Sequence, residues 1–212
     1  MIRNTAAVLA RDGPNQPELR AQLIYEELLT RFAGAGAVVL ENEEEATLEE
    51  LSEIHSTLFL RFLKGAHASA VAAQDKFLLK EQALVPLTYW TGSREDVPTL
   101  SATLPLYLQS SLFVRDFMSP IFATTWPSVS LSAGNTLKAA RLLQPAAPEA
   151  AGKVVYALNS SPGHHASKDG ELPLFDIHGP FAHSCLSQPS LAIVSCACYI
   201  LSLPCSHEVI FF

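Results

Sequence analysis

Hydrophobic residues recur every three or four positions in four stretches of this chain, which is the spacing of helices that bury one face. Residues 17–32 show it first, and Pro17 suits the first turn of a helix. Residues 48–62 carry a second hydrophobic stripe, and residues 66–82 form a third, Ala-rich stretch. Residues 127–143 form the fourth, again with a proline in the first turn. The pattern therefore predicts four long helices.

Two short apolar runs interrupt this helical pattern and indicate strands. Residues 37–40 and 154–158 are rich in valine and leucine, as buried strands are. Residues 99–114 are helical in pattern but contain Pro105, which breaks or kinks a helix. Helices that alternate with short buried strands are typical of a mainly parallel sheet, because parallel neighbours need crossover connections. We therefore expect an α/β protein.

The strand expected at residues 154–158 leads into the most distinctive segment of the chain. A polar turn, Asn-Ser-Ser-Pro-Gly at residues 159–163, is followed directly by His164 and His165. Ligands of open α/β sheets lie beyond the carboxyl ends of the strands. Histidine can both accept and release a proton near neutral pH. We therefore predict a functional site at this turn, with two solvated loop histidines as the alternative.

Composition narrows the classes of function. The net charge of −7 argues against a nucleic-acid surface built on bulk positive charge. The chain is 49% hydrophobic and 17% charged, which fits a globular protein. No apolar run is long enough to span a membrane, and the N-terminal apolar stretch is too short for a signal peptide. All four cysteines lie after residue 184, so we expect a reducing compartment for the main body.

The strand, the Pro-Gly turn and the two histidines together resemble the signature loop of the zinc-dependent deacetylases, the histone deacetylase and acetylpolyamine amidohydrolase superfamily. In many members the loop reads Arg-Pro-Pro-Gly-His-His-Ala, and this chain has Pro-Gly-His-His-Ala at residues 162–166. The helix at residues 48–62, which includes His55, is similar to a second family element. Ser-Ala-Gly at residues 132–134 is similar to a third. Judged by residue type alone, His55 is a packing or surface histidine, and Ser-Ala-Gly permits close helix packing.

The resemblance implies a role for each residue of the site. His165 would be the general base for the water that attacks an amide carbonyl, and would later pass the proton to the leaving amine. His164 would lie beside it, tuned by a buried carboxylate. Gly163 would belong to the substrate-binding loop, and Asp116 would be the aspartate that steers the substrate backbone. Asp96 competes for that last role, and an exposed loop position is the alternative for either aspartate.

The metal ligands are where this chain departs from the family pattern. The resemblance implies a zinc ion held by an Asp-x-His pair and a second aspartate, all downstream of the histidines. Asp176 and His178 imitate the pair, but Asp176 comes only 11 residues after His165. That interval is too short for the intervening helix and strand of the family, and Asp176 is the last aspartate of the chain. Asp176 and His178 are therefore only weak candidates for metal ligands.

The resemblance stops at Gly170, and the composition changes there. Residues 171–212 contain all the cysteines and lose the helical periodicity. The apolar run at 191–203 is too short to span a bilayer comfortably, and the cysteines lack a standard metal-finger spacing. We therefore predict that residues 1–170 are the N-terminal part of a deacetylase-like domain. Residues 171–212 would be an aberrant or poorly ordered tail, translated from a retained intron or a frameshift.

These observations lead to one fold and a ranked set of functions. The resemblance implies a partial three-layer sandwich with a mainly parallel sheet, a truncated arginase–deacetylase fold. The leading function is zinc-dependent hydrolysis of an acetyl amide on lysine, in a histone or another protein, or on a polyamine. The alternative, which we expect for the chain as given, is a catalytically inactive deacetylase-like protein or an interaction remnant. An unrelated α/β protein with a coincidental Pro-Gly-His-His is the third hypothesis.

The expected partners follow from the leading function. They are an acetylated lysine or polyamine, with no direct nucleic-acid contact and no membrane. The expected compartment is the cytoplasm or the nucleus, and the sequence does not identify a chromatin complex.

Overall fold

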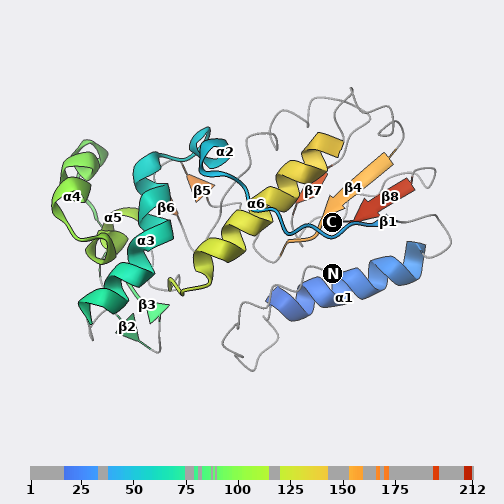
Figure 1. The fold of residues 1–212 in the computed structure, drawn as a ribbon, viewed down its shortest axis with the longest axis horizontal. Helices are drawn as coiled ribbons and strands as arrows, with labels where there is room; N and C mark the ends of the chain where they lie inside the picture. The colour runs from blue at the N-terminus through green and yellow to red at the C-terminus, as the bar shows by residue number, and fades with distance from the viewer. Residues whose placement is uncertain are drawn as a thin grey trace. The chain divides into compact units, whose positions relative to one another are not determined.

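In a computed structural model of the chain, the described residues are 17–32, 38–74, 79–80, 83–86, 88, 90–114, 120–142, 153–159, 166–167, 170–171, 193–195 and 208–211 (Figure 1). The chain divides into two compact units, each considered separately below. Unit 1 draws on Met1–Thr47, Ser130–Pro162 and His178–Phe212. Unit 2 draws on Leu48–Val129 and Gly163–Ile177.

Unit 1 contains a four-stranded parallel sheet in the described part of the chain. Its strands, in spatial order, are β1 (Val38–Val39), β8 (Glu208–Phe211), β4 (Lys153–Ala157) and β7 (Ile193–Ser195). Each pair of neighbours runs parallel, and β4 pairs with β8 on one side and with β7 on the other. The predicted α/β class and parallel sheet are therefore confirmed, with β4 in the interior of the sheet.

Among the described strands, β1 lies at the edge of this sheet, where it pairs with β8. The predicted strand at residues 37–40 is confirmed as β1, but the prediction that it is buried is wrong. The side chain of Val38 is 50% exposed, and Val39 and Leu40 are only partly buried. An edge strand has no neighbouring strand on its outer side, so less of its surface is covered.

Strands β7 and β8 lie within residues 171–212, for which the sequence predicted an aberrant or poorly ordered tail. Their described residues pair with β4, where Val155 is in register with Ile193 on one side and with Ile210 on the other. The domain boundary at residue 170 and the origin of the tail stay predictions.

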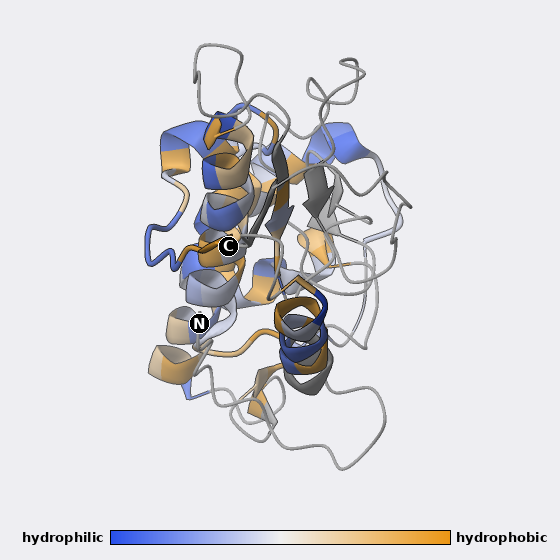
Figure 2. Cartoon of the chain, turned by 90° about the vertical axis from the view of Figure 1, so that its right-hand side faces the viewer, coloured by the Kyte–Doolittle hydropathy of each residue, from blue (hydrophilic) through white to orange (hydrophobic). Residues whose placement is uncertain are grey.

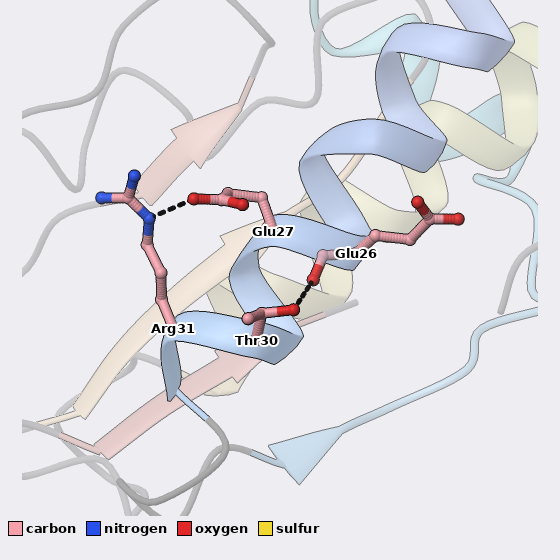
Figure 3. Close-up of polar contacts among 4 residues, drawn as sticks. All are labelled: Glu26, Glu27, Thr30 and Arg31. Atoms are coloured by element: carbon pink, nitrogen blue, oxygen red, sulfur yellow. Dashed lines mark hydrogen bonds and ion pairs between the residues drawn. The ribbon is translucent and has the colours of Figure 1, made fainter.

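Helix α1 (Pro17–Phe32) has the bounds that the hydrophobic spacing predicted. Its surface carries polar pairs at the i, i+4 spacing that brings two side chains together on a helix (Figure 3). The Nε atom of Arg31 donates to Oε1 of Glu27 at 2.5 Å, and Oγ1 of Thr30 donates to the carbonyl of Glu26 at 2.9 Å. These contacts are local in sequence and add to the hydrophobic spacing that predicted this helix.

Helix α6 (Thr125–Leu142) begins in unit 2 and continues in unit 1, close to the bounds 127–143 predicted from the sequence. Its unit 1 part packs on the sheet, and Figure 1 shows α6 alongside β4. Ala139 of α6 and Val155 and Ala157 of β4 form one cluster in which all three side chains are fully buried. Small residues at this contact allow the helix to lie close to the strand.

The hydrophobic stripe at residues 48–62 belongs to two helices of unit 2, α2 (Leu48–Ser52) and α3 (Thr57–Ala73), so the prediction of one continuous helix is wrong. The chain leaves the helical path between them, and Ser56 caps the second helix. Its hydroxyl accepts a hydrogen bond from the N–H of Phe59 at 3.3 Å. A serine that satisfies this N–H starts a helix, and the helical spacing of hydrophobic residues does not reveal such a start.

Helix α3 also ends earlier than predicted, at Ala73. Gln74 follows in the left-handed conformation, with φ 53° and ψ 34°, and its N–H donates to the carbonyl of Val71. A left-handed residue at this position ends a helix by turning the chain away from its axis. Leu79–Lys80 then forms strand β2, antiparallel to β3 (Ala83–Leu84), where the sequence predicted helix up to residue 82.

Short elements make up the rest of unit 2. They are η1 (Arg94–Asp96), α4 (Val97–Thr103), η2 (Leu106–Gln109), α5 (Ser110–Phe113), and the antiparallel pair β5 (Ala166–Ser167) and β6 (Gly170–Glu171). Pro105 lies between α4 and η2, so the predicted break in this helical stretch is confirmed. None of the described helices is long and apolar enough to cross a membrane.

The interior of unit 2 is apolar and rich in aromatic rings. Phe62 stacks on Phe113 with 5.0 Å between ring centroids, and Phe59 lies 5.9 Å from the same ring. The other buried members of this cluster are Leu63, Ala66, Ala70, Leu84, Val97, Leu112, Val114, Ile121 and Val129. Figure 2 shows hydrophobic and hydrophilic residues alternating along the helices, as expected of helices with one buried face.

Candidate functional site

The site residues predicted from the sequence fall outside the described part of the chain. They are His164, His165, Gly163, Asp116, Asp176 and His178. Asp96, the competitor of Asp116, is described: it is the last residue of η1, and its side chain is exposed. For Asp96 the structure therefore agrees with the alternative of an exposed position.

The described residues frame the histidine turn on both sides. The strand predicted at residues 154–158 is confirmed as β4, and its Val155 and Ala157 are fully buried. Asn159 follows two residues after the strand and is also buried, with 5% of its surface exposed. After the turn, Ala166 pairs with Glu171 in the β5–β6 ladder. The strand that leads to the histidines is thus fixed in the interior of unit 1.

A buried polar cluster holds the carboxyl end of β4. Nδ2 of Asn159 donates to Oγ1 of Thr136 at 3.0 Å, and that hydroxyl donates to the carbonyl of Ser132 at 3.1 Å. Oδ1 of Asn159 accepts from Nδ2 of Asn135 at 3.2 Å. Thr136, Ser132 and Asn135 all belong to α6. The amide of Asn159 is therefore bonded on both its donor and its acceptor side to one helix.

The cluster continues to the segment that precedes α2. Nδ2 of Asn42 donates to Oδ1 of Asn135 at 2.8 Å and to the carbonyl of Glu44 at 3.0 Å. Oδ1 of Asn42 accepts from Nζ of Lys138 at 3.2 Å. Asn42 and Asn135 are 1% and 2% exposed, so little water competes for these bonds. We call Asn42, Asn135, Asn159 and Thr136 the asparagine chain.

Residues 42–46 lie directly against the backbone of α6. The N–H of Ala46 donates to the carbonyl of Ser130 at 2.9 Å. A Cβ atom on Gly134 would lie 2.1 Å from the carbonyl oxygen of Glu44 and 3.0 Å from the nitrogen of Ala46. The close helix packing predicted for residues 132–134 is therefore confirmed at Gly134, where the neighbour is backbone. This contact brings Asn42 within reach of Asn135.

The family resemblance implies a zinc ion, which needs three or more ligating side chains close together. Among them, no three His, Cys, Asp or Glu side chains come together in a group that could hold a metal ion. The two weak ligand candidates, Asp176 and His178, lie outside the described residues. The part of the chain that the structure describes therefore does not fit a zinc site.

His55 is a packing histidine, as its residue pattern indicated. It is 1% exposed, and its ring lies 5.5 Å from the ring of Phe59. It follows the end of α2, where its N–H donates to the carbonyl of Leu51 at 2.9 Å. Its place is in the interior of unit 2.

The asparagine chain was not predicted from the sequence. Its members are 93 residues apart in one hydrogen bond and 24 in another, and no local pattern connects such distant positions. One signal was present: Asn135 stands in the interior of a predicted helix, where asparagine is unfavourable unless its side chain has a bonding partner.

Comparisons with known proteins agree with the signature loop. Residues 14–171 match the family described as the histone deacetylase domain. The structure is similar to that of an acetylpolyamine aminohydrolase from Burkholderia pseudomallei, with a TM-score of 0.59 and 21% sequence identity. The similarity covers 79% of this chain but 43% of that one, so the chain spans less than half the length of that structure. No curated protein matches the sequence.

The structural similarity shows a shared fold, and the family match shows similarity in sequence. That match covers well over half of the chain and includes strand β4, both histidines of the turn, and the β5–β6 pair that follows. It also ends at residue 171, next to the position where the resemblance read from the sequence stops. This chain belongs to the histone deacetylase domain family.

Proposed function

We propose that this chain carries the tandem-histidine part of a zinc-dependent deacetylase of the arginase–deacetylase fold. Its substrate would be the acetyl amide of an acetylated lysine side chain or of an acetylated polyamine. The observation that supports this most is the family match across residues 14–171, because it contains Pro-Gly-His-His at the carboxyl end of a buried strand. The fold shared with an acetylpolyamine aminohydrolase also supports it.

The proposed reaction is hydrolysis of an amide. The oxygen of water adds to the carbonyl carbon, the C–N bond breaks, and acetate and a free amine are released. His165 takes the proton from the attacking water and returns it to the leaving nitrogen, and His164 is its neighbour in the same turn. Asp116 and Gly163 belong to the substrate-binding side, where the carboxylate of Asp116 accepts hydrogen bonds from substrate N–H groups.

Zinc is the cofactor proposed on the basis of the family. When bound, it would act as a Lewis acid that polarises the carbonyl and lowers the pKa of water. Its ligands are not among the described residues, and Asp176 and His178 lie beyond the end of the family match at residue 171. A deacetylase of this kind acts where acetylated lysines or polyamines occur, in the cytoplasm or the nucleus.

The family match also leaves room for a second candidate function, that of a non-catalytic deacetylase-like protein that binds partners. The described residues hold no metal-binding group, and residues 172–212 have no counterpart in the family match. Without a Lewis acid, neutral imidazole in a turn is too weak a catalyst for a stable amide. The two candidates make opposite predictions for metal content.

Zinc analysis combined with an amidase assay separates the two. The purified chain is analysed for bound zinc and incubated with an acetyl-lysine peptide and with an acetylated polyamine. The enzyme hypothesis predicts one zinc per chain and a loss of about 10²-fold or more in hydrolysis in His165→Ala, the size typical of a lost general base. His67→Ala in α3 is the matched control and should retain activity. Chains without zinc, and turnover equal to that of His165→Ala, would establish the non-catalytic candidate.

A further inference from the structure

We propose that strand β1 and the acidic residues that follow it form a docking surface for an extended, lysine- or arginine-rich segment of a partner protein. Such a segment would add a strand to the outer side of β1, as peptides do at exposed sheet edges. All of the residues involved belong to unit 1. This surface goes beyond the proposed hydrolysis and does not depend on it, so either one can exist without the other.

Strand β1 has the features of an edge that accepts a further strand. Among the described strands it pairs with β8, and Val38 is in register with Ile210. An edge strand presents backbone N–H and C=O groups on its outer side, and a new strand can pair with them. Val38 is 50% exposed, so an apolar side chain lies beside these groups and can contact a side chain of the added strand.

The sequence of this edge lacks the usual protection against unwanted pairing. Edge strands are commonly protected by a charged side chain, especially lysine, or by a proline. Residues 37–40 are Ala-Val-Val-Leu and contain neither. An edge of this composition accepts strands of many sequences, so the choice among them depends on the charges that lie next to it.

The charges next to β1 favour a basic partner. The run Glu41–Glu45 contains four glutamates and no basic residue, and the last three glutamates are exposed. Lysine and arginine side chains of a bound segment would be attracted to them. A second copy of this chain would instead bring another net charge of −7 to the same surface and would be repelled. The charge complementarity therefore points to a basic segment of another protein.

The acidic run is held by helix α6, which makes it a fixed surface. The N–H of Ala46 donates to the carbonyl of Ser130 at 2.9 Å, and Nδ2 of Asn42 donates to Oδ1 of Asn135 at 2.8 Å. The glutamates between Asn42 and Ala46 are therefore placed before a partner arrives. A surface that is already fixed loses little conformational freedom on binding, and this favours affinity.

Fluorescence anisotropy of a labelled peptide tests this surface on the full chain. The probe has about eight residues, the length of an ordinary strand, and alternates lysine with valine. It should bind, and its affinity should fall as salt is added. Two control peptides should not bind: one has glutamate in place of lysine, and the other is methylated at every backbone nitrogen and cannot donate strand hydrogen bonds. Absence of binding by the probe, or equal binding by the methylated peptide, would overturn the proposal.

Hydrogen exchange followed by NMR tests where the probe binds. Neighbouring residues of a strand direct their backbone groups to alternate sides, so one of Val38 and Val39 faces away from β8. The amide of that residue should exchange about fivefold more slowly in the complex, as expected for one added hydrogen bond. Amides of α3 in unit 2 should be unaffected. Unchanged exchange at both valines would show that no strand is added there.

Two double variants separate the local charges from the net charge. Glu43→Gln with Glu44→Gln removes two exposed carboxylates next to β1, and Glu49→Gln with Glu53→Gln removes two exposed carboxylates from unit 2. The first pair should weaken binding of the lysine–valine probe by about three- to tenfold, and the second by less than about twofold. Equal weakening would mean that the probe responds to net charge alone, and the docking surface would be refuted.

Variants of Val38 test the strand edge itself. Val38→Lys places a positive charge on the edge and should weaken binding of the probe by about tenfold or more, whereas Val38→Thr keeps a β-branched side chain and should stay within about threefold. Equal affinities in two folded variants would contradict pairing at β1. Analytical ultracentrifugation tests the other occupant: a wild-type dimer that Val38→Lys converts to monomers would assign the edge to a second copy and overturn the proposal of a basic partner.

Discussion

The two units differ in the side chains that dominate their interiors. Unit 2 is packed with aromatic and aliphatic side chains. Within it, the rings of Phe59 and Phe62 both lie against the ring of Phe113. Unit 1, in its described part, buries Leu137 and several small apolar residues together with the asparagine chain. The first interior depends on apolar area, and the second on hydrogen bonds between residues that are far apart in sequence.

This difference predicts that one unit contributes more to stability and the other more to fixed geometry. Burial of a large apolar side chain contributes about 1.5–3 kcal/mol, and it tolerates small shifts because dispersion has no direction. A buried hydrogen bond contributes only about 1 kcal/mol net, but both its distance and its angle are constrained. Unit 2 is therefore expected to supply more stability for each residue that it buries. Unit 1 is expected to hold the end of β4 in one place relative to the unit 1 part of α6.

The largest expected effect is the loss of an aromatic ring from unit 2. Phe113→Ala removes the ring that Phe62 stacks on and leaves a cavity, which costs about 3–5 kcal/mol of unfolding free energy. Leu108→Ala is the control, because Leu108 is 37% exposed in the same unit, and it should cost much less. Urea unfolding followed by circular dichroism measures both. Equal midpoints for the two variants would contradict an interior held by apolar area.

The next effect compares the same substitution in two helices. Gly134→Ala in α6 places a Cβ atom against the backbone of Glu44, whereas Gly65→Ala in α3 places it 2.9 Å from Cδ1 of Leu106. A side-chain tip can rotate away and a backbone cannot. Alanine also favours a helix over glycine by about 1 kcal/mol, and this gain is fully opposed only at Gly134. We expect Gly134→Ala to lower stability by about 2 kcal/mol or more and Gly65→Ala to change it little.

Thermal unfolding of both glycine variants measures this difference. A Gly134→Ala protein as stable as Gly65→Ala would show that residues 42–46 are free to move away from α6. In that case the contact that brings Asn42 to Asn135 would not be fixed, and the contrast between the two interiors would lose its basis.

The sequence was informative wherever structure depends on neighbouring residues. Hydrophobic spacing predicted α1 and α6, the apolar run predicted β4, and Pro105 predicted a break, because each signal lies within one element. The division between α2 and α3 was missed, since Ser56 acts through a single cap bond that a hydrophobic stripe does not register. The early end of α3 was missed for a similar reason, because Gln74 takes a left-handed conformation without being a glycine.

The candidate site was predictable in part. The Pro-Gly-His-His turn is a short local motif, and it indicated the family that the match over residues 14–171 then showed. The hydrogen bonds at the end of β4 were not predictable, because Asn42, Asn135 and Asn159 come from three separate segments. Each of them is polar, and by residue type alone a polar residue suggests a turn or a surface. Only the fold shows that these three are buried together.

A smaller effect is expected within the asparagine chain itself. Asn42→Ala removes the donor to Asn135 and the acceptor of Lys138, and should lower unfolding free energy by about 1–3 kcal/mol. A double-mutant cycle with Asn135→Ala isolates their coupling, which we expect at about 1 kcal/mol. Additive losses would mean that the two amides act independently. The control, Ser52→Ala, removes an exposed hydroxyl that donates to the carbonyl of Glu49 and should be close to neutral.

The smallest expected effect is at an exposed ion pair. It tests whether burial, and not polarity alone, accounts for the stability that the asparagine chain contributes. Arg31 and Glu27 of α1 form a short ion pair, but their side chains are 71% and 58% exposed (Figure 3). Water solvates both groups when they separate, and salt screens their attraction, so Glu27→Gln should cost about 0.5 kcal/mol or less. That loss should shrink further at 1 M salt, whereas the loss in Asn42→Ala should not change. If the exposed charged pair contributed as much as the buried amides, unit 1 would owe its geometry to charge and not to burial, and the asparagine chain would have no special role in holding the end of β4.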